Sequence, residues 1–573
     1  MNIVKLFLYV SLAIFILEFI SKKNLRKVLM MKPCLFMANS LLLLDLVLLF
    51  SLLTQVFHVT IIVVSLILII LGIANRIKID YRQTGFTPLD FLIFREAKSM
   101  AGALNKKSML CLTVSALLST VLLLGLTWFL EPVQMTGYLK TVIIFLSLIT
   151  IIGFYVLGPR YNQSISVFKV GTIIYFLSYL NDPPSIRISG RKRNLPHIKD
   201  IAEVKADGPD VIVIQSESFV DPYELGKENF NNDPLPFYRS LCEEAYSFSM
   251  STRAFGGGTV HTEYEILTGL STVFFPRDTT VFSRYIKEPL PSLGSILKNQ
   301  GYGSLLIHPY LEWYYNRTKV YKKLGFDKFL SLRSFNSESD GYVKDMDVFK
   351  RIVQELDNGN KLVVAVTMQN HTPYNKDLHN NGVLYLGSFR DPDTKRHFNN
   401  FLNGLGETDK ALSYLIEELK NRDNETILLF YGDHLPVVNQ DAAFYEESKW
   451  SAGDFDSWKY YYDLSKSPGF IWSNKRLIKG TSKDIDATSV LPILLNEINC
   501  DYPEYLKNLA DVFEKEAYNG LFRDFVVRNN IFYGSKHPEY IKIFKTVRDI
   551  NDSAFNNAVY DEWCFENDSY EVN

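Results

Sequence analysis

The first 160 or so residues contain several long apolar runs, and these constrain the fold more than any other feature of the chain. A helix needs roughly 20 mostly apolar residues to cross the hydrocarbon core of a bilayer. Shorter runs, of roughly 10–14 residues, are often buried core helices of soluble proteins. Runs of the longer kind lie near residues 3–21, 35–56, 58–75, 109–130 and 138–158. The sequence therefore predicts a transmembrane domain of about five helices over residues 1–160.

The first apolar run is typical of a membrane anchor, because it lacks a small-residue cleavage site and ends in Lys22 and Lys23. A later stretch, 167–180, is shorter and contains Lys169. We expect it to lie along the membrane surface and to form, within residues 161–199, an interfacial helix and linker. A core helix of the next domain is the alternative.

The distribution of basic residues leaves the membrane orientation open. Basic residues concentrate in segments 22–32 and 76–107, which lie on one side of the membrane if five helices span it. The positive-inside rule makes that side cytoplasmic, and the C-terminal domain would then be cytoplasmic too. If the stretch 167–180 also spans, the same rule places that domain outside.

The chain changes character after Leu180, where Asn181, Asp182, Pro183 and Pro184 follow in succession. This polar, proline-bearing break cannot continue a helix, so we expect a second domain over residues 200–573. The net charge of −2, without a basic block, argues against nucleic acid as a partner. Five cysteines without a CxxC pair form no disulfide framework and leave the compartment undecided.

Three short apolar runs in the second domain, 211–214, 362–366 and 427–430, are typical of strands buried on both faces. Such strands form parallel sheets covered by helices, so we expect an α/β domain. Polar residues follow each run within a few positions. Because ligands gather at the carboxyl ends of strands in open α/β sheets, we expect the three ends to converge on one site.

Two of these strand ends carry residues that suit a metal ion. The first strand is followed by Glu217, and the third by Asp433 and His434. A mixture of carboxylate and imidazole suits Mn²⁺ or Zn²⁺ better than Ca²⁺, which prefers oxygen ligands alone. Taken singly, each motif has another interpretation, in which Glu217 caps a helix and Asp433 bonds to backbone amides in a turn.

A glycine-rich segment between these strands ends in Thr259. Three glycines, Gly256 to Gly258, let the backbone approach a ligand closely and turn its amides toward phosphate oxygens. A helix that follows them would add its N-terminal dipole, and a hydroxyl near a bound metal becomes a competent nucleophile. A flexible turn with Thr259 as a helix N-cap is the alternative. Glu263 would share a helix face with Thr259 and either orients the site or faces solvent.

Two further clusters resemble binding sites for a small phosphorylated polyol. His308 follows the short run 305–307, and Tyr315 and Arg317 come soon after it. Arginine grips phosphate with two parallel hydrogen bonds, and an aromatic ring can wall a polyol. His371 follows the second predicted strand. A single histidine is more often structural than functional, but here both histidines recur at strand ends.

Taken in order, these motifs resemble the lipoteichoic acid synthase and phosphoglycerol transferase family of the alkaline phosphatase and sulfatase superfamily. The resemblance covers nearly the whole chain, from the apolar helices to the segment Gly432-Asp433-His434. It implies a multi-pass α-helical membrane domain followed by an α/β alkaline-phosphatase/sulfatase-like domain. It also implies a nucleophile, Thr259, with Mn²⁺ held by Glu217, Thr259, Asp433 and His434, and glycerol phosphate contacts from His308, Arg317 and His371. Tyr315 stands where the lipoteichoic acid synthases proper carry Trp, which leaves the acceptor open.

By this resemblance, the chain transfers glycerol phosphate from phosphatidylglycerol to a cell-envelope acceptor through a phospho-threonine intermediate. The implied acceptor is a teichoic acid (polyglycerol phosphate), a glycan or a glycolipid. The implied location is the bacterial plasma membrane, with the catalytic domain outside the cytoplasm.

Other activities of the superfamily are open to the same residues. A phosphodiesterase would use water as the acceptor, and a phosphoethanolamine transferase shares the membrane-plus-domain layout, although its catalytic domain is commonly rich in disulfides. A noncatalytic envelope assembly protein could retain the fold, but the complete set of ligands and nucleophile argues against it. A sulfatase that uses formylglycine would need a C/S-x-P-x-R motif, and the sequence contains none.

Overall fold

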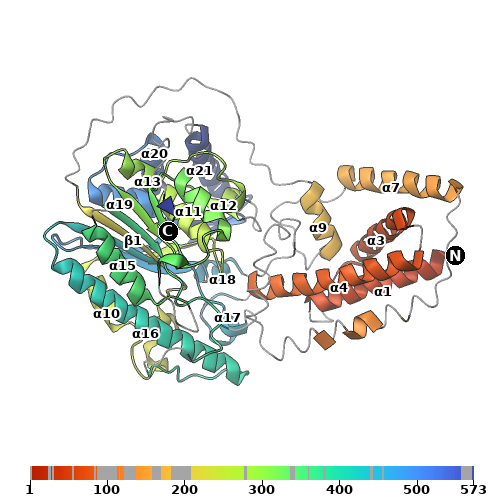
Figure 1. Cartoon of the computed structure of the whole chain (residues 1–573), viewed down its shortest axis with the longest axis horizontal. Helices are drawn as coiled ribbons and strands as arrows, with labels where there is room; N and C mark the ends of the chain where they lie inside the picture. Colours follow the sequence, from red (N-terminus) through yellow and green to blue (C-terminus); the bar gives the residue numbers. More distant parts are fainter. Residues whose placement is uncertain are drawn as a thin grey trace. The chain divides into compact units, whose positions relative to one another are not determined.

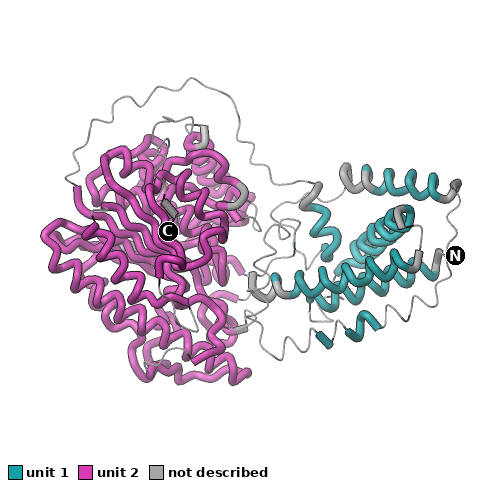
Figure 2. Tube along the Cα trace, in the orientation of Figure 1, with its two compact units in different colours: residues 1–186, 276–278 teal, residues 187–275, 279–573 magenta. Residues whose placement is uncertain are grey.

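Two compact units divide the chain close to residue 186 in a computed structural model (Figure 2). The boundaries 1–160, 161–199 and 200–573 stay predictions. The structure describes residues 3–22, 28, 31–54, 57–82, 86, 113–114, 117–121, 125, 137–157, 170–181, 208–275, 280–335, 342–358, 361–377, 382–438, 443–454, 457–556 and 571–572.

Long helices make up the described part of the N-terminal unit (Figure 1). Four of the five apolar runs coincide with helices, while most of the run 109–130 lies outside the described residues. Within these helices, the windows Pro33–Leu52 and Val59–Arg76 are long and apolar enough to cross a bilayer. The number of spans stays a prediction. The helices are α1 (Ile3–Lys22), α3 (Pro33–Thr54), α4 (Phe57–Arg82) and α7 (Gly137–Leu157).

Large apolar side chains lie exposed along these helices, among them Leu66, Ile67 and Ile70 on α4 and Leu148 and Ile149 on α7. Groups of exposed large apolar side chains are typical of surfaces that contact a membrane or another protein. Two membrane-length helices with apolar outer faces favour a membrane anchor for this unit.

A short helix, α9 (Thr172–Asn181), is bound to α1 and α3 through polar side chains. The Glu18 carboxylate accepts a hydrogen bond from the Thr172 amide at 2.5 Å, and Asn39 Oδ1 accepts one from the Ile174 amide at 3.0 Å. Lys22 neutralises Glu18 at 2.9 Å. With 10 residues, α9 is too short to cross a bilayer. Whether the stretch 167–180 lies on the membrane surface stays a prediction.

The C-terminal unit is built on a mixed nine-stranded sheet. Its centre is four neighbouring parallel strands in the order β3 (Ser304–Ile307), β5 (Leu362–Val366), β1 (Asp210–Ser216) and β6 (Thr426–Gly432). The three predicted strands are thus confirmed as adjacent and parallel, and all three are buried on both faces. The flanking strands are β12 (Glu571–Val572) and β4 (Lys328–Leu330) on one side, and β7 (Lys466–Ser473), β2 (Tyr246–Ser251) and β8 (Gly480–Asp486) on the other.

Helices cover both faces of this sheet (Figure 1). Ile212 and Ile214 of β1 belong to a buried cluster with residues of α10 (Pro236–Glu244), α15 (Asp345–Asp357) and α16 (Pro392–Lys420). Val211 and Val213 alternate with them and are equally buried, since successive strand residues point to opposite faces. The other helices and the small second sheet are α11 (Thr259–Thr268), α12 (Val281–Arg284), α13 (Leu293–Lys298), α14 (Arg317–Lys323), α17 (Ala443–Glu447), α18 (Trp458–Asp463), α19 (Val490–Ile498), α20 (Glu504–Glu516), α21 (Pro538–Asn556), β9 (Tyr518–Leu521), β10 (Phe525–Arg528) and β11 (Ile531–Gly534).

Strand register brings the candidate site residues to one level at the carboxyl edge. Ser216 of β1 pairs with Gly432 of β6, so the next residues, Glu217 and Asp433, begin at the same height. Gly432 also lies against the chain that follows Glu217. A Cβ atom at Gly432 would sit 1.9 Å from the Phe219 carbonyl oxygen, which is closer than any side chain allows.

Replacing Gly432 with alanine is therefore expected to push apart the segments that carry Glu217 and Asp433. We expect Gly432→Ala to lower the free energy of unfolding by roughly 1–3 kcal/mol, as overpacked core substitutions do, and to weaken metal binding in parallel. Thermal denaturation with and without added Mn²⁺ measures both effects. A variant with unchanged stability and unchanged metal affinity would contradict this account of Gly432.

Candidate active site

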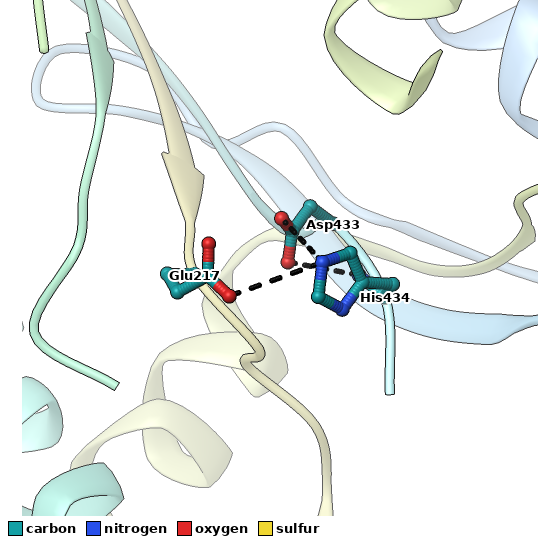
Figure 3. Close-up of side chains that lie close together, drawn as sticks. All are labelled: Glu217, Asp433 and His434. Atoms are coloured by element: carbon teal, nitrogen blue, oxygen red, sulfur yellow. Dashed lines mark hydrogen bonds and ion pairs between the residues drawn. The ribbon is translucent and has the colours of Figure 1, made fainter. Parts of the chain in front are cut away.

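Three buried side chains converge at the carboxyl edge of β1 and β6 (Figure 3). Glu217, Asp433 and His434 each offer one ligand atom, and these atoms all lie within 4.8 Å of one another. His434 Nε2 is 3.3 Å from Asp433 Oδ2 and 3.8 Å from Glu217 Oε1. Residues that are 216 positions apart in the chain are thus brought together by the pairing of the two strands.

Hydrogen bonds to the backbone fix which atoms of this group face one another. Asp433 Oδ1 accepts from the backbone amides of Ser218 at 2.8 Å and His434 at 2.9 Å, while Oδ2 is buried without a hydrogen-bond partner. His434 Nδ1 lies 3.0 Å from the Leu435 carbonyl oxygen. With the ring proton on Nδ1, His434 Nε2 presents a lone pair to the carboxylates.

Such a convergence of lone pairs fits a divalent cation. Two carboxylates and one imidazole supply oxygen and nitrogen donors, and the backbone bonds to Asp433 and His434 orient these ligands as outer-shell contacts do in metal proteins. The buried and unpartnered Asp433 Oδ2 is costly without a positive charge beside it. These residues can therefore hold a divalent metal. The two carboxylates and the imidazole do not by themselves distinguish one divalent ion from another.

The pKa of the Glu217 carboxyl is raised from 4.5 to about 8 in the metal-free protein. Burial is the largest cause, and the neighbouring Asp433 carboxylate raises the pKa further, while His434, the Ser218 hydroxyl and Arg317 lower it. Glu217 therefore binds a proton near neutral pH when no metal is present, and a metal must displace that proton.

Metal affinity is expected to rise about tenfold per pH unit as the pH approaches 8, because one proton leaves Glu217 for each ion bound. In the metal-free protein the raised pKa contributes stability that is fully present below 4.5 and is lost as the pH rises through about 8. The metal-free melting temperature should thus fall between pH 6 and pH 8.5, and added Mn²⁺ should reverse the fall. Calorimetric titration in two buffers of different ionisation enthalpy counts the released proton. A pH-independent affinity would contradict this assignment.

Thr259 stands at the first position of α11, directly after the glycine-rich segment. Its Oγ1 lies 3.5 Å from Glu217 Oε2 and 3.5 Å from His434 Nε2, so the hydroxyl lies beside Glu217, Asp433 and His434, the three residues that can hold a metal and are called the metal-binding group below. Gly258 precedes it in the left-handed region with φ of +86°, a conformation that favours glycine. The helix predicted after the glycines is confirmed, but its N-cap is Gly258 and not Thr259.

Three polar residues that sequence reasoning missed fix the start of α11. Gln215 Nε2 donates to the Thr259 carbonyl at 3.1 Å, and Tyr431 donates to Gln215 Oε1 at 2.9 Å. Thr262 Oγ1 donates to the Asp433 carbonyl at 2.8 Å. The first turn of α11 is thereby bonded to the ends of β1 and β6. The sequence did contain one signal for the role of Gln215, because this residue is polar and stands at the end of an otherwise apolar run.

His308 and Arg317 lie near each other and are both almost completely buried. His308 Nδ1 bonds to the Val366 carbonyl oxygen at 3.0 Å, and its Nε2 has no hydrogen-bond partner. Burial and the nearby Arg317 guanidinium hold the pKa of His308 well below its usual range, so its ring is neutral. Arg317 also influences the pKa of Glu217, which places its charge close to the metal-binding group. Tyr315 is buried, and the Arg317 guanidinium lies 5.2 Å from the centre of its ring.

His371 follows β5, as predicted, and contacts a residue that the sequence did not single out. Tyr342 Oη lies 3.1 Å from His371 Nδ1, and the two rings meet edge to face with centroids 5.2 Å apart. His371 influences the pKa of buried His308, so the two histidines lie near each other. No motif surrounds Tyr342 in the sequence, and only the fold brings it to His371.

Comparison with known protein families bears on this arrangement. A family model described as sulfatase matches residues 209–495, which is half of the chain. The chain belongs to the sulfatase family. The match begins just before β1 and ends within α19, so it includes every strand of the sheet except β12. The nine-stranded sheet with helices on both faces is the α/β sulfatase-like domain that the motifs predicted.

Several curated proteins are similar to this chain. A protein of Rhizobium meliloti named for cyclic beta-1,2-glucan modification is 32% identical over 356 residues, which is 61% of this chain and 54% of that protein. Lipoteichoic acid synthase 2 of Bacillus subtilis is 24% identical, over 59% of this chain and 51% of that protein. The chain thus spans about half the length of these relatives. Among solved structures, the Streptococcus pyogenes phosphoglycerol transferase GacH with sn-glycerol-1-phosphate is 23% identical with a TM-score of 0.49, covering 61% of this chain and 87% of that chain.

Proposed function

We propose that the chain is a membrane-anchored phosphotransferase that moves glycerol phosphate from phosphatidylglycerol to a cell-envelope acceptor. One observation carries the proposal: a hydroxyl, Thr259 Oγ1, lies 3.5 Å from both Glu217 and His434 within a buried group that can hold a divalent metal. The relatives named for lipoteichoic acid synthesis and glucan modification favour an envelope substrate. We propose Mn²⁺ as the ion, with Thr259 completing the ligands.

The residues beside Thr259 suit the headgroup of the proposed donor. Arg317 offers guanidinium N–H groups to nonbridging phosphate oxygens, which is the strong form of phosphate recognition. His308 is neutral, with Nδ1 bonded to the backbone, so its unpartnered Nε2 can accept a hydrogen bond from a glycerol hydroxyl. His371 and Tyr315 complete the proposed binding residues, the first beside His308 and the second against Arg317.

The proposed reaction is a double displacement. Thr259 Oγ forms a bond to phosphorus while the bond from phosphorus to the diacylglycerol oxygen breaks, and the proton lost by Thr259 leaves on that oxygen. An acceptor hydroxyl then forms the second phosphorus–oxygen bond, the Thr259 bond breaks, and the acceptor proton returns to Thr259. A bound divalent ion would lower the pKa of the threonine hydroxyl and offset charge on the phosphoryl oxygens. A membrane anchor suits this donor, since enzyme and lipid then share one surface.

Water could replace the acceptor, which would make the protein a phosphodiesterase. Transfer of phosphoethanolamine is disfavoured, because Cys34, Cys242 and Cys500 are free thiols and the described part of the chain contains no disulfide. The acceptor that we propose is a glycan, a glycolipid or a polyglycerol phosphate. Catalysis outside the cytoplasm belongs to the same proposal, because such acceptors lie in the envelope.

The direct test uses the purified full chain, Mn²⁺ and phosphatidylglycerol labelled in the glycerol headgroup. We expect release of diacylglycerol and, without acceptor, label on a peptide that contains Thr259. Absence of both products would exclude phosphatidylglycerol as the donor. Release of labelled glycerol phosphate into water, at the same rate with and without an added acceptor, would identify a phosphodiesterase.

A further inference from the structure

Glu263 forms a buried ion pair with Arg317 one helical turn after Thr259. Glu263 Oε2 lies 3.0 Å from Arg317 Nη2, and the side chains are 1% exposed. The sequence left open whether Glu263 faces solvent or orients the site, and the structure excludes solvent. Because Thr259 and Glu263 are residues i and i+4 of α11, the ion pair connects the nucleophile's helix to the guanidinium beside the metal-binding group.

The ion pair leaves hydrogen-bonding capacity unused on both partners. Glu263 Oε1 and Arg317 Nε are buried without a hydrogen-bond partner. An unsatisfied buried group is costly, so its presence calls for an explanation such as a ligand or a functional role. Tyr321 of α14 is buried beside the pair, and its hydroxyl interacts with both the Glu263 carboxylate and the Arg317 guanidinium.

The backbone before Arg317 also needs external support. Tyr315 and Asn316 have φ values of +55° and +59°, two successive left-handed residues without a glycine. Residues other than glycine rarely adopt such conformations, and they persist where the surrounding structure holds them. The ion pair with Glu263 holds the first residue after this strained turn.

We propose that Glu263 is a positioning residue, which fixes the Arg317 guanidinium relative to Thr259 Oγ1 so that the bound phosphoryl group lies in line with the nucleophile. This inference rests on the proposed phosphotransferase function. One carboxylate on the nucleophile's own helix thereby sets the distance between the attacking oxygen and the group that grips phosphate. Movement of α11 would shift both together.

The same helix provides a matched comparison. Glu265 of α11 pairs with Arg253 at 3.0 Å and is equally buried. Its Oε1 accepts from the amide and the hydroxyl of Thr272, and Arg253 also binds Asp486 and the Leu521 carbonyl. Within the described residues, neither member of this pair has an unpartnered buried atom. The Arg253–Glu265 pair is therefore a satisfied structural contact, unlike Glu263–Arg317.

The test compares Glu263→Gln with Glu265→Gln in single-turnover labelling of Thr259 by headgroup-labelled phosphatidylglycerol. The burst amplitude counts folded sites, and the rate constant reports alignment. For Glu263→Gln we expect a rate constant about 10- to 100-fold lower, as a misplacement of about 1 Å would give, at an amplitude near that of the parent protein. For Glu265→Gln we expect the amplitude or the melting temperature to fall while the rate constant stays within about threefold.

Glu263→Asp keeps the charge and is expected to recover part of the lost rate. If Glu263→Gln does not fold, the labelling rate constant of Glu263→Asp is the test. A rate constant below that of the parent protein supports the proposal. A rate constant equal to the parent's in both Glu263 variants, or an equal loss of rate in Glu265→Gln, would overturn it. If the unmodified protein shows neither labelling nor diacylglycerol release, the proposed function fails and this inference fails with it. If the unmodified protein turns over normally and both Glu263 variants label Thr259 at its rate, the proposed function stands and only this inference is overturned.

Discussion

Thr259→Ala is expected to lower the rate of diacylglycerol release from phosphatidylglycerol by at least about 10³-fold, in line with removal of nucleophiles from other covalent enzymes. The reason is geometric. Thr259 Oγ1 lies 3.5 Å from Glu217 and from His434, at the N-terminus of α11, where backbone amides and the helix dipole favour negative charge. Alanine keeps the helix but removes the oxygen. Lipid product analysis and mass spectrometry of the labelled peptide measure the loss.

Thr259→Ser is the matched control, because it keeps the hydroxyl and removes only a methyl group. We expect it to retain labelling at a rate within about 100-fold of the parent protein, since positioning alone can change rates by that factor. The Thr259 carbonyl, which accepts from Gln215, is a backbone group and is present in both variants. Full turnover by Thr259→Ala, or label on another residue, would show that Thr259 is not the nucleophile.

Continuous apolar runs made the sheet and its site edge predictable from the sequence. A run such as 362–366, apolar at every position, can be satisfied only where both faces are covered, and β5 spans those same residues. Once strands 211–214, 362–366 and 427–430 were taken as parallel, their carboxyl ends had to lie together. The meeting of Glu217 with Asp433 and His434 therefore follows from a local pattern and one rule of topology.

Residues that act across the fold were not predictable in this way. Gln215 and Thr262 hold α11 through bonds to residues 44 and 171 positions away in sequence. Tyr342 reaches His371 through tertiary contact alone. The fate of Glu263 was left open because helix periodicity fixes which residues share a face, but not what packs against that face.

The distribution of basic residues also did not determine the membrane orientation. The positive-inside rule depends on the number of spanning helices, and one additional span reverses the side of every later segment. The helices α3 and α4 meet the length and hydropathy needed to cross a bilayer, while α9 has 10 residues and is bonded to Glu18 and Asn39. Protease digestion of wall-free cells, with cleavage beyond residue 200 as the readout, tests the predicted placement outside.

Asp433→Asn is expected to weaken Mn²⁺ binding by at least about 100-fold, the upper range for loss of an outer-shell contact alone. The substitution keeps the shape, and the amide oxygen can still accept from the Ser218 and His434 amides as Oδ1 does. It replaces Oδ2, which faces His434 Nε2 at 3.3 Å, with an NH₂ group that cannot bind a cation. Because the Asp433 charge raises the pKa of Glu217, that pKa should fall in the variant. Titration calorimetry and metal analysis measure the affinity.

Asp409→Asn separates loss of metal from loss of stability. Asp409 is another buried carboxylate that accepts from two backbone amides, those of Phe237 at 3.0 Å and Tyr238 at 2.7 Å, but it lies outside the metal-binding group. Its substitution should lower the melting temperature without changing Mn²⁺ affinity. Asp433→Asn should instead weaken Mn²⁺ binding and raise the melting temperature of the metal-free protein near pH 8. The melting temperature rises because the substitution removes one of two adjacent buried charges and so relieves their repulsion. If both variants lost stability equally and both retained metal, Asp433 would be a turn residue held by backbone amides and the metal site would lie elsewhere.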